Sequence, residues 1–101
     1  MGSRRSFALA PIIVNGIRIT HVIIDTHYEK KHADYMSDSL ILKLVEKLDG
    51  RREFPEARTA NYSYFATLIE HNNKQYRLIW LLEDHAIYVG VVNAYRDKRR
   101  K

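Results

Sequence analysis

Apolar and polar positions first form a clear pattern in two β-branched segments, over 11–14 and 17–24, that are joined by Asn15-Gly16. Asn-Gly supplies two residues that tolerate a positive φ, which the two-residue type I′ turn of a β-hairpin requires. We therefore predict an N-terminal β-hairpin over 11–24.

The segment that follows is more polar. Asp25 or Thr26 can cap a helix by accepting a hydrogen bond from one of its first backbone N–H groups. The pattern therefore predicts a short helix over 27–36.

A second helix has a stronger apolar pattern. Ser37 or Asp38 offers the cap, and Gly50 tolerates the left-handed conformation that ends a helix. One helical stripe carries the apolar residues Leu40, Ile41, Leu44, Val45 and Leu48. We predict a helix over 38–49 that packs on a sheet through this stripe.

The rest of the chain has the period-2 pattern of strands after a predicted loop over 51–61. The predicted strands cover 62–70, 75–82 and 86–95. Short turns make sequential strands antiparallel, and the apolar centre of the third predicts a central strand covered on both faces. The fold class is therefore α+β, with an N-terminal β-hairpin and a short helical segment packed on a twisted antiparallel sheet that ends in a three-strand meander.

Composition adds limits to this fold. The 101 residues, 46% of them hydrophobic, fit a single domain over 1–101. The chain has no cysteine, which excludes disulfides and Cys-ligated metal sites. No apolar run approaches the roughly 18 residues of a membrane-spanning helix, and the apolar stretch after Arg4-Arg5 is too short for an export signal. We expect a cytoplasmic protein that does not enter a membrane.

The formal net charge of +5 is concentrated at the two ends of the chain. Segments 1–5 and 96–101 carry seven positive side chains and one negative, so the body between them has a net charge of about −1. This distribution favours a local phosphate-binding site, and the alternative is a solvated tail that aids solubility. We predict that 1–6 and 97–101 are flexible, basic ends.

Three histidines, His21, His27 and His32, lie close together in the sequence. His27 and His32 are five residues apart, about 140° around an α-helix, and no HExxH motif is present, so the spacing argues against a metal site. Lys31 precedes His32 directly. Imidazole titrates near neutral pH and can move the proton of a ribose 2′-hydroxyl, and an ammonium group stabilises charge on a phosphate. The alternative is a set of surface histidines without chemistry.

Arg77 interrupts the apolar strand predicted over 75–82 and shares a strand face with Ile79 and Leu81. A charged side chain inside such a strand is costly unless it faces solvent, a partner or a ligand. One explanation is an ion pair with a cross-strand acid such as Glu70, and the other is a phosphate ligand.

The last predicted strand carries further polar groups. Asn93 and Tyr95 share a face, and Arg96 leads into the cationic end. With Arg77, these residues would gather phosphate-binding and hydrogen-bonding groups at one end of the sheet.

The segment 76–101, YRLIWLLEDHAIYVGVVNAYRDKRRK, resembles the C-terminal half of RelE- and HigB-type toxins, where a YRL strand, an acidic turn, an apolar strand and a basic ending recur. The segment 27–38, HYEKKHADYMSD, is similar to the Lys/His-bearing helical segment of the wider barnase–EndoU–colicin–RelE group of ribonucleases. In that group the meander ends in a small polar residue, an alanine and an aromatic residue, as Asn93-Ala94-Tyr95 does here. The chain departs from RelE toxins in its opening hairpin and in having Tyr95 before the basic motif.

The resemblance implies metal-independent cleavage of RNA, free or on the ribosome, by the toxin of a toxin–antitoxin pair, with no cofactor. It implies that a small antitoxin neutralises the toxin, and we expect an acidic antitoxin because charge across such an interface is complementary. Arg77 matches the arginine of YRL, and Arg96 with Arg99 matches the basic ending. Lys31 and His32 match only the pattern of the wider group. The candidate catalytic residues are His32, Arg77, Arg96, Lys31 and Tyr95, and the candidate RNA-binding residues are Asn93, Lys98, Arg99 and Arg100.

Two other functions remain open. The first is a non-catalytic RNA- or DNA-binding module, because several aromatic residues could form a base-stacking sheet face, namely Tyr62, Tyr64, Phe65, Tyr76, Trp80 and Tyr88. The second is a protein-interaction role, such as that of an immunity or phage accessory protein. RNA binding without cleavage would indicate the first function, and absence of nucleic-acid affinity at low salt would indicate the second.

Overall fold

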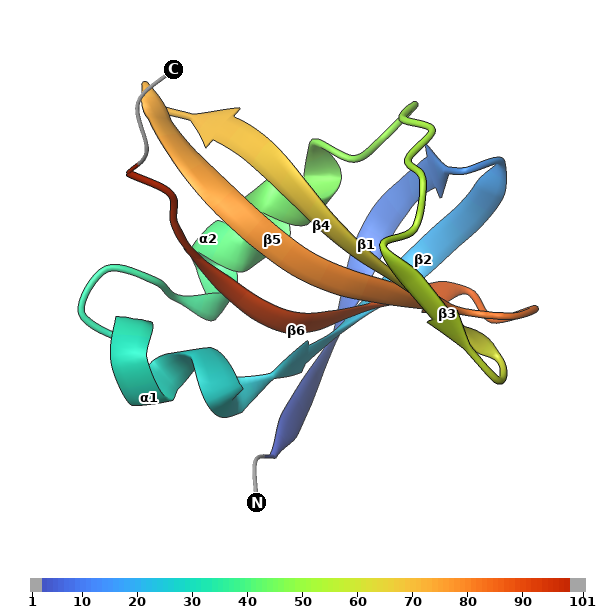
Figure 1. Cartoon of the computed structure of the whole chain (residues 1–101), viewed down its shortest axis with the longest axis horizontal. Coiled ribbons are helices and arrows are strands. Elements are labelled where there is room, and N and C mark those ends of the chain that lie inside the picture. The colour runs from blue at the N-terminus through green and yellow to red at the C-terminus, as the bar shows by residue number, and fades with distance from the viewer. Residues whose placement is uncertain (1–2, 99–101) are drawn as a thin grey trace.

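The computed structural model describes residues 3–98 as an α+β fold, a six-stranded sheet with short helices (Figure 1). Among these residues, no helix is long and apolar enough to cross a membrane. In chain order the elements are β1 (Arg4–Val14), β2 (Ile17–Asp25), the 3-10 turn η1 (Thr26–Tyr28), α1 (Glu29–His32), α2 (Asp38–Glu46), β3 (Ala57–Thr59), β4 (Tyr62–His71), β5 (Lys74–Glu83) and β6 (Tyr88–Arg96).

The sheet has the order β1-β2-β6-β5-β4-β3. The hairpin β1–β2 and the meander β4–β5–β6 are antiparallel, as predicted, and β6 is a central strand between β2 and β5. The prediction of a wholly antiparallel sheet is wrong, because β6 pairs in parallel with β2, from His21 beside Tyr88 to Ile24 beside Val91. Both helices and three strands separate β2 from β6 in the chain, so no short turn dictates their relative direction.

Asparagine and glycine set the tight turns of the sheet. Asn15 and Gly16 have φ of 52° and 76°, so the predicted two-residue turn with two positive φ values is confirmed. Asn72 and Asn73, with φ of 53° and 66°, make the equivalent turn between β4 and β5. These residues tolerate the left-handed region better than β-branched or bulky ones, which fixes where each hairpin reverses.

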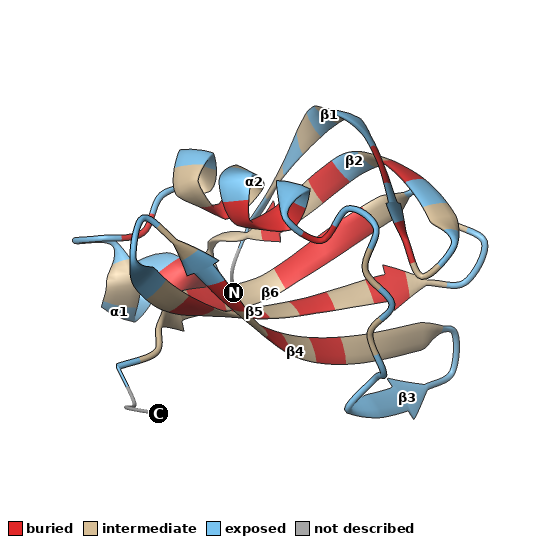
Figure 2. Ribbon diagram, turned by 90° about the horizontal axis from the view of Figure 1, so that it is seen from above, coloured by how far each residue is buried: buried red, intermediate tan, exposed pale blue. Residues whose placement is uncertain are grey.

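The core lies between α2 and one face of the sheet, and Figure 2 shows the buried side of α2 turned toward the strands. The predicted apolar stripe is confirmed at Ile41, Leu44, Val45 and Leu48, which have no exposed surface, whereas Leu40 is half-buried. The α-helix is shorter than the predicted 38–49, because α2 ends at Glu46 and Leu48 follows it. On β5 the residues from Tyr76 to Leu82 alternate between buried and half-buried, so the strand turns one face to the core and one away from it. We call these the covered face, which α2 packs on, and the open face.

The first helical segment is shorter than predicted. The expected helix over 27–36 ends at His32, after the turn η1 and the single α-turn α1. Asp25 is its cap, since its carboxylate accepts a hydrogen bond from the His27 N–H at 2.9 Å. Two apolar side chains of the segment, Tyr28 and Met36, are 2% and 3% exposed and attach it to the core.

Other element boundaries also differ from the prediction. Residues 4–6, expected to be flexible, begin β1, and the Asp97 N–H donates to the carbonyl of Gln75 at 2.9 Å. The predicted loop over 51–61 contains the short edge strand β3, which pairs with β4. The last strand starts at Tyr88 and not at residue 86, which leaves Ile87 outside it and 55% exposed.

Candidate active site

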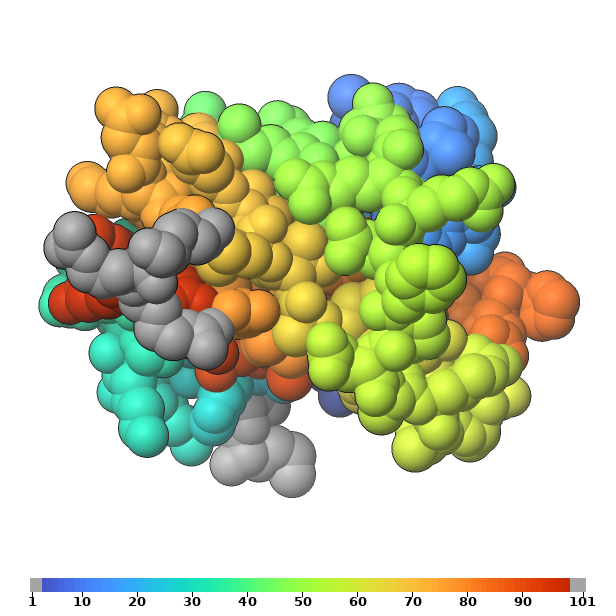
Figure 3. All heavy atoms as spheres, turned by 45° about the horizontal axis from the view of Figure 1, so that its top comes forward, coloured from blue at the N-terminus to red at the C-terminus, as the bar shows by residue number. Residues whose placement is uncertain are grey.

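A pocket of about 280 Å³ lies where η1 and α1 meet the open face of β6. In Figure 3 the teal helical segment and the red end of β6 lie side by side at one end of the molecule. The pocket is lined by His27, Lys31, His32, Asn93 and Tyr95. Four of these five residues, all except His27, were predicted from sequence as candidate site residues, although more than sixty positions separate the helical group from the strand group.

His32 is held between two tyrosine rings. Its ring centroid lies 5.7 Å from that of Tyr35 and 5.5 Å from that of Tyr95. The His32 Nδ1 is 2.9 Å from the Tyr35 hydroxyl, which also accepts a hydrogen bond from the Arg96 backbone N–H at 3.3 Å. Tyr35 therefore links the helical segment to the end of β6, and its contact with Nδ1 leaves Nε2 as the ring nitrogen for chemistry in the pocket.

Asn93 is presented to the pocket by an irregularity in β6. Ile79 of β5 pairs with Asn93 and the next residue, Trp80, pairs with Val91, so β6 carries one extra residue at Val92. Such bulges redirect side chains and are common beside functional sites. The Asn93 Oδ1 accepts a hydrogen bond from the Ala94 N–H at 2.9 Å, which leaves the side-chain NH₂ as a donor toward the pocket.

An ion-pair network connects the helical segment to β1 and α2. Arg5 donates to Asp38 at 2.5 Å and to Glu29 at 2.6 Å, and the Tyr28 hydroxyl donates to the same Asp38 carboxylate at 2.8 Å. The hydrogen bond from Arg5 lowers the pKa of Asp38, and burial raises the pKa of Tyr28 to about 12. The network stabilises the position of the segment that carries His27, Lys31 and His32.

His27 is the pocket residue that sequence reasoning missed. Its five-residue separation from His32 would place the two on different faces of a regular α-helix. The segment is instead a 3-10 turn followed by one α-turn, and both side chains line the pocket. The spacing of His27 and Lys31, four residues or about one helical turn, was the available signal.

Arg77 lies beside the pocket and is already paired. It faces Tyr95 across the β5–β6 ladder, and its Nη2 lies 2.7 Å from the Asp97 carboxylate. The explanation of Arg77 as one half of an ion pair is therefore confirmed, but the acid is Asp97 and not the suggested Glu70, which lies beside Gln75 at the turn end of β4. The Arg77 and Asp97 side chains are only 22% and 6% exposed, so this ion pair fixes Arg77 next to the pocket wall.

The remaining candidates lie away from the pocket. Arg96 follows Tyr95 on a strand and so points to the opposite face, where its Nε is buried and has no hydrogen-bond partner within residues 3–98. Lys98 is exposed at the end of the described segment. Arg99 and Arg100, predicted to bind RNA, lie outside the described residues.

The pocket combines the groups that acid–base chemistry on a phosphodiester requires. Two imidazoles can serve as general base and general acid, and the Lys31 ammonium supplies positive charge. Tyr95 and Asn93 add hydrogen-bond donors from the strand side. Among residues 3–98, no group of three or more histidine, aspartate and glutamate residues is arranged to hold a metal ion. No protein-family model, curated protein or solved structure matches this chain.

Proposed function

We propose that this protein is an endoribonuclease that cleaves RNA without a metal ion through attack of a ribose 2′-hydroxyl. The observation that carries the proposal is the pocket itself, in which His27, His32 and Lys31 from the helical segment meet Asn93 and Tyr95 from β6. The sequence resemblances agree with the proposal, because segment 27–38, similar to the wider ribonuclease group, and segment 76–101, similar to RelE-type toxins, contribute the two walls of the pocket.

In the proposed reaction the 2′-oxygen forms a bond to the adjacent phosphorus while the bond from phosphorus to the 5′-oxygen breaks. One imidazole removes the 2′-hydroxyl proton, and the other, in its protonated form, gives a proton to the departing 5′-oxygen. The product is a 2′,3′-cyclic phosphate and a free 5′-hydroxyl. His32 is the better-positioned base, because Tyr35 can accept from its Nδ1–H and leave the Nε2 lone pair free for the substrate.

Negative charge grows on the non-bridging phosphate oxygens as the 2′-oxygen attacks. Lys31 is the cation inside the pocket, and Asn93 can add a neutral donor. Arg77 contributes less directly, because the Asp97 carboxylate offsets part of its charge and it does not line the pocket. Arg96 has no role at the scissile phosphate in this mechanism, since it lies on the opposite face.

The biological setting that we propose is a cytoplasmic toxin neutralised by an acidic antitoxin. A partner that covers the pocket would place carboxylates against Lys31 and Arg77, because opposite charges across an interface speed association and select the partner. Induced expression should then stop growth with the wild type and not with the double variant His27→Ala/His32→Ala. Equal growth arrest by both proteins would argue against a ribonuclease toxin.

The decisive experiment is incubation of the purified protein with RNA, free and on ribosomes, in excess EDTA. Wild type should produce 2′,3′-cyclic phosphate ends. His32→Ala and His27→Ala should each lower the rate by about 10²–10⁴, the usual contribution of a general acid or base. His21→Ala is the matched control, since His21 is exposed on β2 and lines neither wall of the pocket. Absence of cleavage by wild type in both settings, or loss of activity in the control alone, would refute the proposal.

A further inference from the structure

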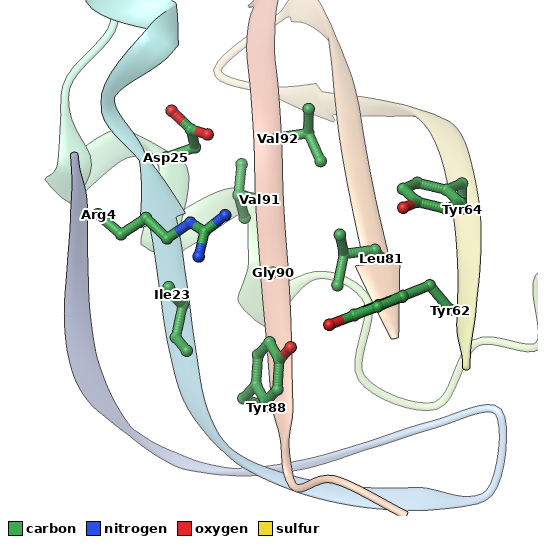
Figure 4. A pocket seen from close by; sticks show the side chains of 10 residues that line it. All are labelled: Arg4, Ile23, Asp25, Tyr62, Tyr64, Leu81, Tyr88, Gly90, Val91 and Val92. Carbon is green, nitrogen blue, oxygen red and sulfur yellow. The ribbon is translucent and has the colours of Figure 1, made fainter. Parts of the chain in front are cut away.

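A second hollow, of about 330 Å³, lies on the open face of the sheet next to the candidate active site (Figure 4). Its walls come from β1, β2, β4, β5 and β6, and they include Arg4, Asp25, Tyr62, Tyr64, Tyr88 and Gly90. It combines three aromatic rings with a cationic side chain, and none of these residues takes part in the proposed chemistry.

We propose that this hollow binds a nucleobase of single-stranded RNA whose phosphodiester is cleaved in the His27/His32 pocket. The inference rests on the proposed function and extends it, because it assigns the part of the site that holds the substrate away from the scissile bond. Tyrosine rings stack on nucleobases of any sequence, and an arginine can stack on a base or bind a backbone phosphate.

The shape of the hollow depends on Gly90. A Cβ atom at this position would lie 2.8 Å from the Leu81 Cδ1 and 3.4 Å from the Tyr88 Cε2, so a side chain would occupy the floor between β5 and β6. Figure 4 shows the Arg4 side chain reaching over β2 from one side, while Tyr62 extends from β4 on the other. The glycine therefore leaves an open floor between a cation and an aromatic wall.

Two connections, one along β6 and one through a helix cap, join the hollow to the candidate active site. Val92 lines the hollow and Asn93, the next residue of β6, lines the catalytic pocket. Asp25 also lines the hollow, and its carboxylate caps the turn that carries His27. Gly90 and Asn93 are three residues apart, or about 10 Å along a strand, so one short stretch of RNA can occupy both sites.

Charge and burial agree with this occupant. Burial and the hydrogen bond to Glu83 raise the pKa of Tyr88 to about 12, so its ring stays neutral at physiological pH. The Tyr62 and Tyr64 rings lie 6.3 Å apart on one wall. Arg4 is exposed, and it forms no salt bridge with another residue of 3–98. Planar bases fit the tyrosine rings. A backbone phosphate fits Arg4 at the edge of the hollow only if it approaches from solvent, on the side away from the carboxylate of Asp25, which is the register partner of Arg4 and also lines the hollow.

The test measures binding of a short fluorescein-labelled 2′-O-methyl RNA of mixed sequence, which lacks the attacking hydroxyl and cannot be cleaved by the proposed mechanism. Tyr62→Leu/Tyr64→Leu should weaken binding by roughly 5- to 100-fold, as expected when a stacking aromatic side chain is removed. Phe54→Leu is the control, because Phe54 is 93% exposed and lies outside the hollow. Arg4→Gln should also weaken binding and flatten its salt dependence, whereas Arg18→Gln, at an exposed arginine of β2, should not.

Thermal unfolding of each variant identifies any loss of fold, and Arg4→Gln tests the hollow without removing a packed ring. Selective weakening by the hollow variants supports the inference even if wild type cuts no RNA, in which case the ribonuclease proposal alone fails. Unchanged binding by all hollow variants of a protein that does cut RNA overturns the inference and leaves the ribonuclease intact. If wild type does not bind the oligonucleotide at low salt, the inference fails, and the cleavage assay with free and ribosome-bound RNA alone decides the ribonuclease proposal.

Discussion

The two faces of the sheet differ in what they contain, although the same strands build both. On β5, Leu78 and Trp80 point to the covered face and have no exposed surface, while Arg77 points to the open face and pairs with Asp97. The covered face is filled by apolar side chains and closed by α2. The open face carries the histidine pocket and the tyrosine-lined hollow.

This difference has a simple physical origin. Side chains alternate along a strand, so each strand can give one face to a dry core and the other to water and ligands. Packing determines the free energy of unfolding on the covered face, and exposed charge and hydrogen-bonding groups determine binding on the other. Substitutions on the two faces should therefore change different measured quantities.

The largest loss of stability should follow a cavity beneath α2. Leu44 has no exposed surface, so Leu44→Ala should lower the free energy of unfolding by about 2–5 kcal/mol. Leu42→Ala, on the same helix at a half-buried position, should cost clearly less. Urea denaturation of both variants measures the free energy of unfolding. Equal losses for the two variants would mean that Leu44 is no more deeply packed against the sheet than Leu42.

The reverse behaviour is expected on the open face. Lys31→Ala should reduce RNA cleavage by about 10²–10³, the effect of removing one donor to developing charge, and should change the free energy of unfolding by less than about 0.5 kcal/mol. Lys30→Ala is the matched control, because it removes the same charge from the preceding residue, which is exposed and does not line the pocket. If Lys31 acts in catalysis, only Lys31→Ala should lose cleavage activity at unchanged stability. Equal cleavage rates for the two variants would mean that only net charge matters.

Local signals predicted most of the fold. The Asn15-Gly16 turn, the stripe that includes Leu44 and the three-strand meander each depend on residues close in sequence, and all three are present. The parallel pairing of β2 with β6 was missed because it joins segments about 65 residues apart, and a strand pattern does not name its partner. The position of β3 was missed because three exposed residues carry no period-2 signal.

The candidate site was predicted unevenly for a related reason. Strand alternation correctly put Asn93 and Tyr95 on one face, and the Lys31-His32 pair was noticed for its chemistry. His27 was missed because its separation from His32 was judged by the geometry of a regular α-helix, whereas the segment is a 3-10 turn followed by one α-turn. Arg96 was chosen for its place in the basic ending, although strand alternation already puts it on the face opposite to Asn93 and Tyr95.

One polar residue on the covered face offers a smaller test. Thr67 is 4% exposed, and its hydroxyl accepts a hydrogen bond from the Trp80 indole at 2.9 Å and donates one to Glu53 at 3.1 Å. Thr67→Val keeps the shape but leaves the buried indole N–H without its acceptor, which should cost about 1–3 kcal/mol. Thermal unfolding should show this loss and no change in cleavage. Thr59→Val, on the exposed strand β3, controls for the effect of a β-branched replacement and should be close to neutral.

The smallest expected effect depends on pH and lies where the covered core meets the segment that carries the pocket. Asp38 accepts hydrogen bonds from Arg5 and Tyr28, and the contact with Arg5 lowers its pKa below the ordinary value of 3.8. Since the pKa is lower in the folded state than in the unfolded state, the carboxylate stabilises the fold fully above about pH 4–5, and this contribution is lost as the pH falls through the folded value.

Asp38→Asn should therefore be less stable than wild type at pH 7, by less than the loss for Leu44→Ala, and the gap should narrow below pH 4. Unfolding free energies of both proteins across this range measure the effect. Asp34→Asn removes an exposed carboxylate from the same connection between α1 and α2, and its difference from wild type should stay small throughout. A gap for Asp38→Asn that stayed constant down to pH 2 would mean that the Arg5 contact does not stabilise the ionised carboxylate. The anchoring of the pocket segment would then rest on the buried side chains of Tyr28 and Met36 and on the contact of Tyr35 with the end of β6.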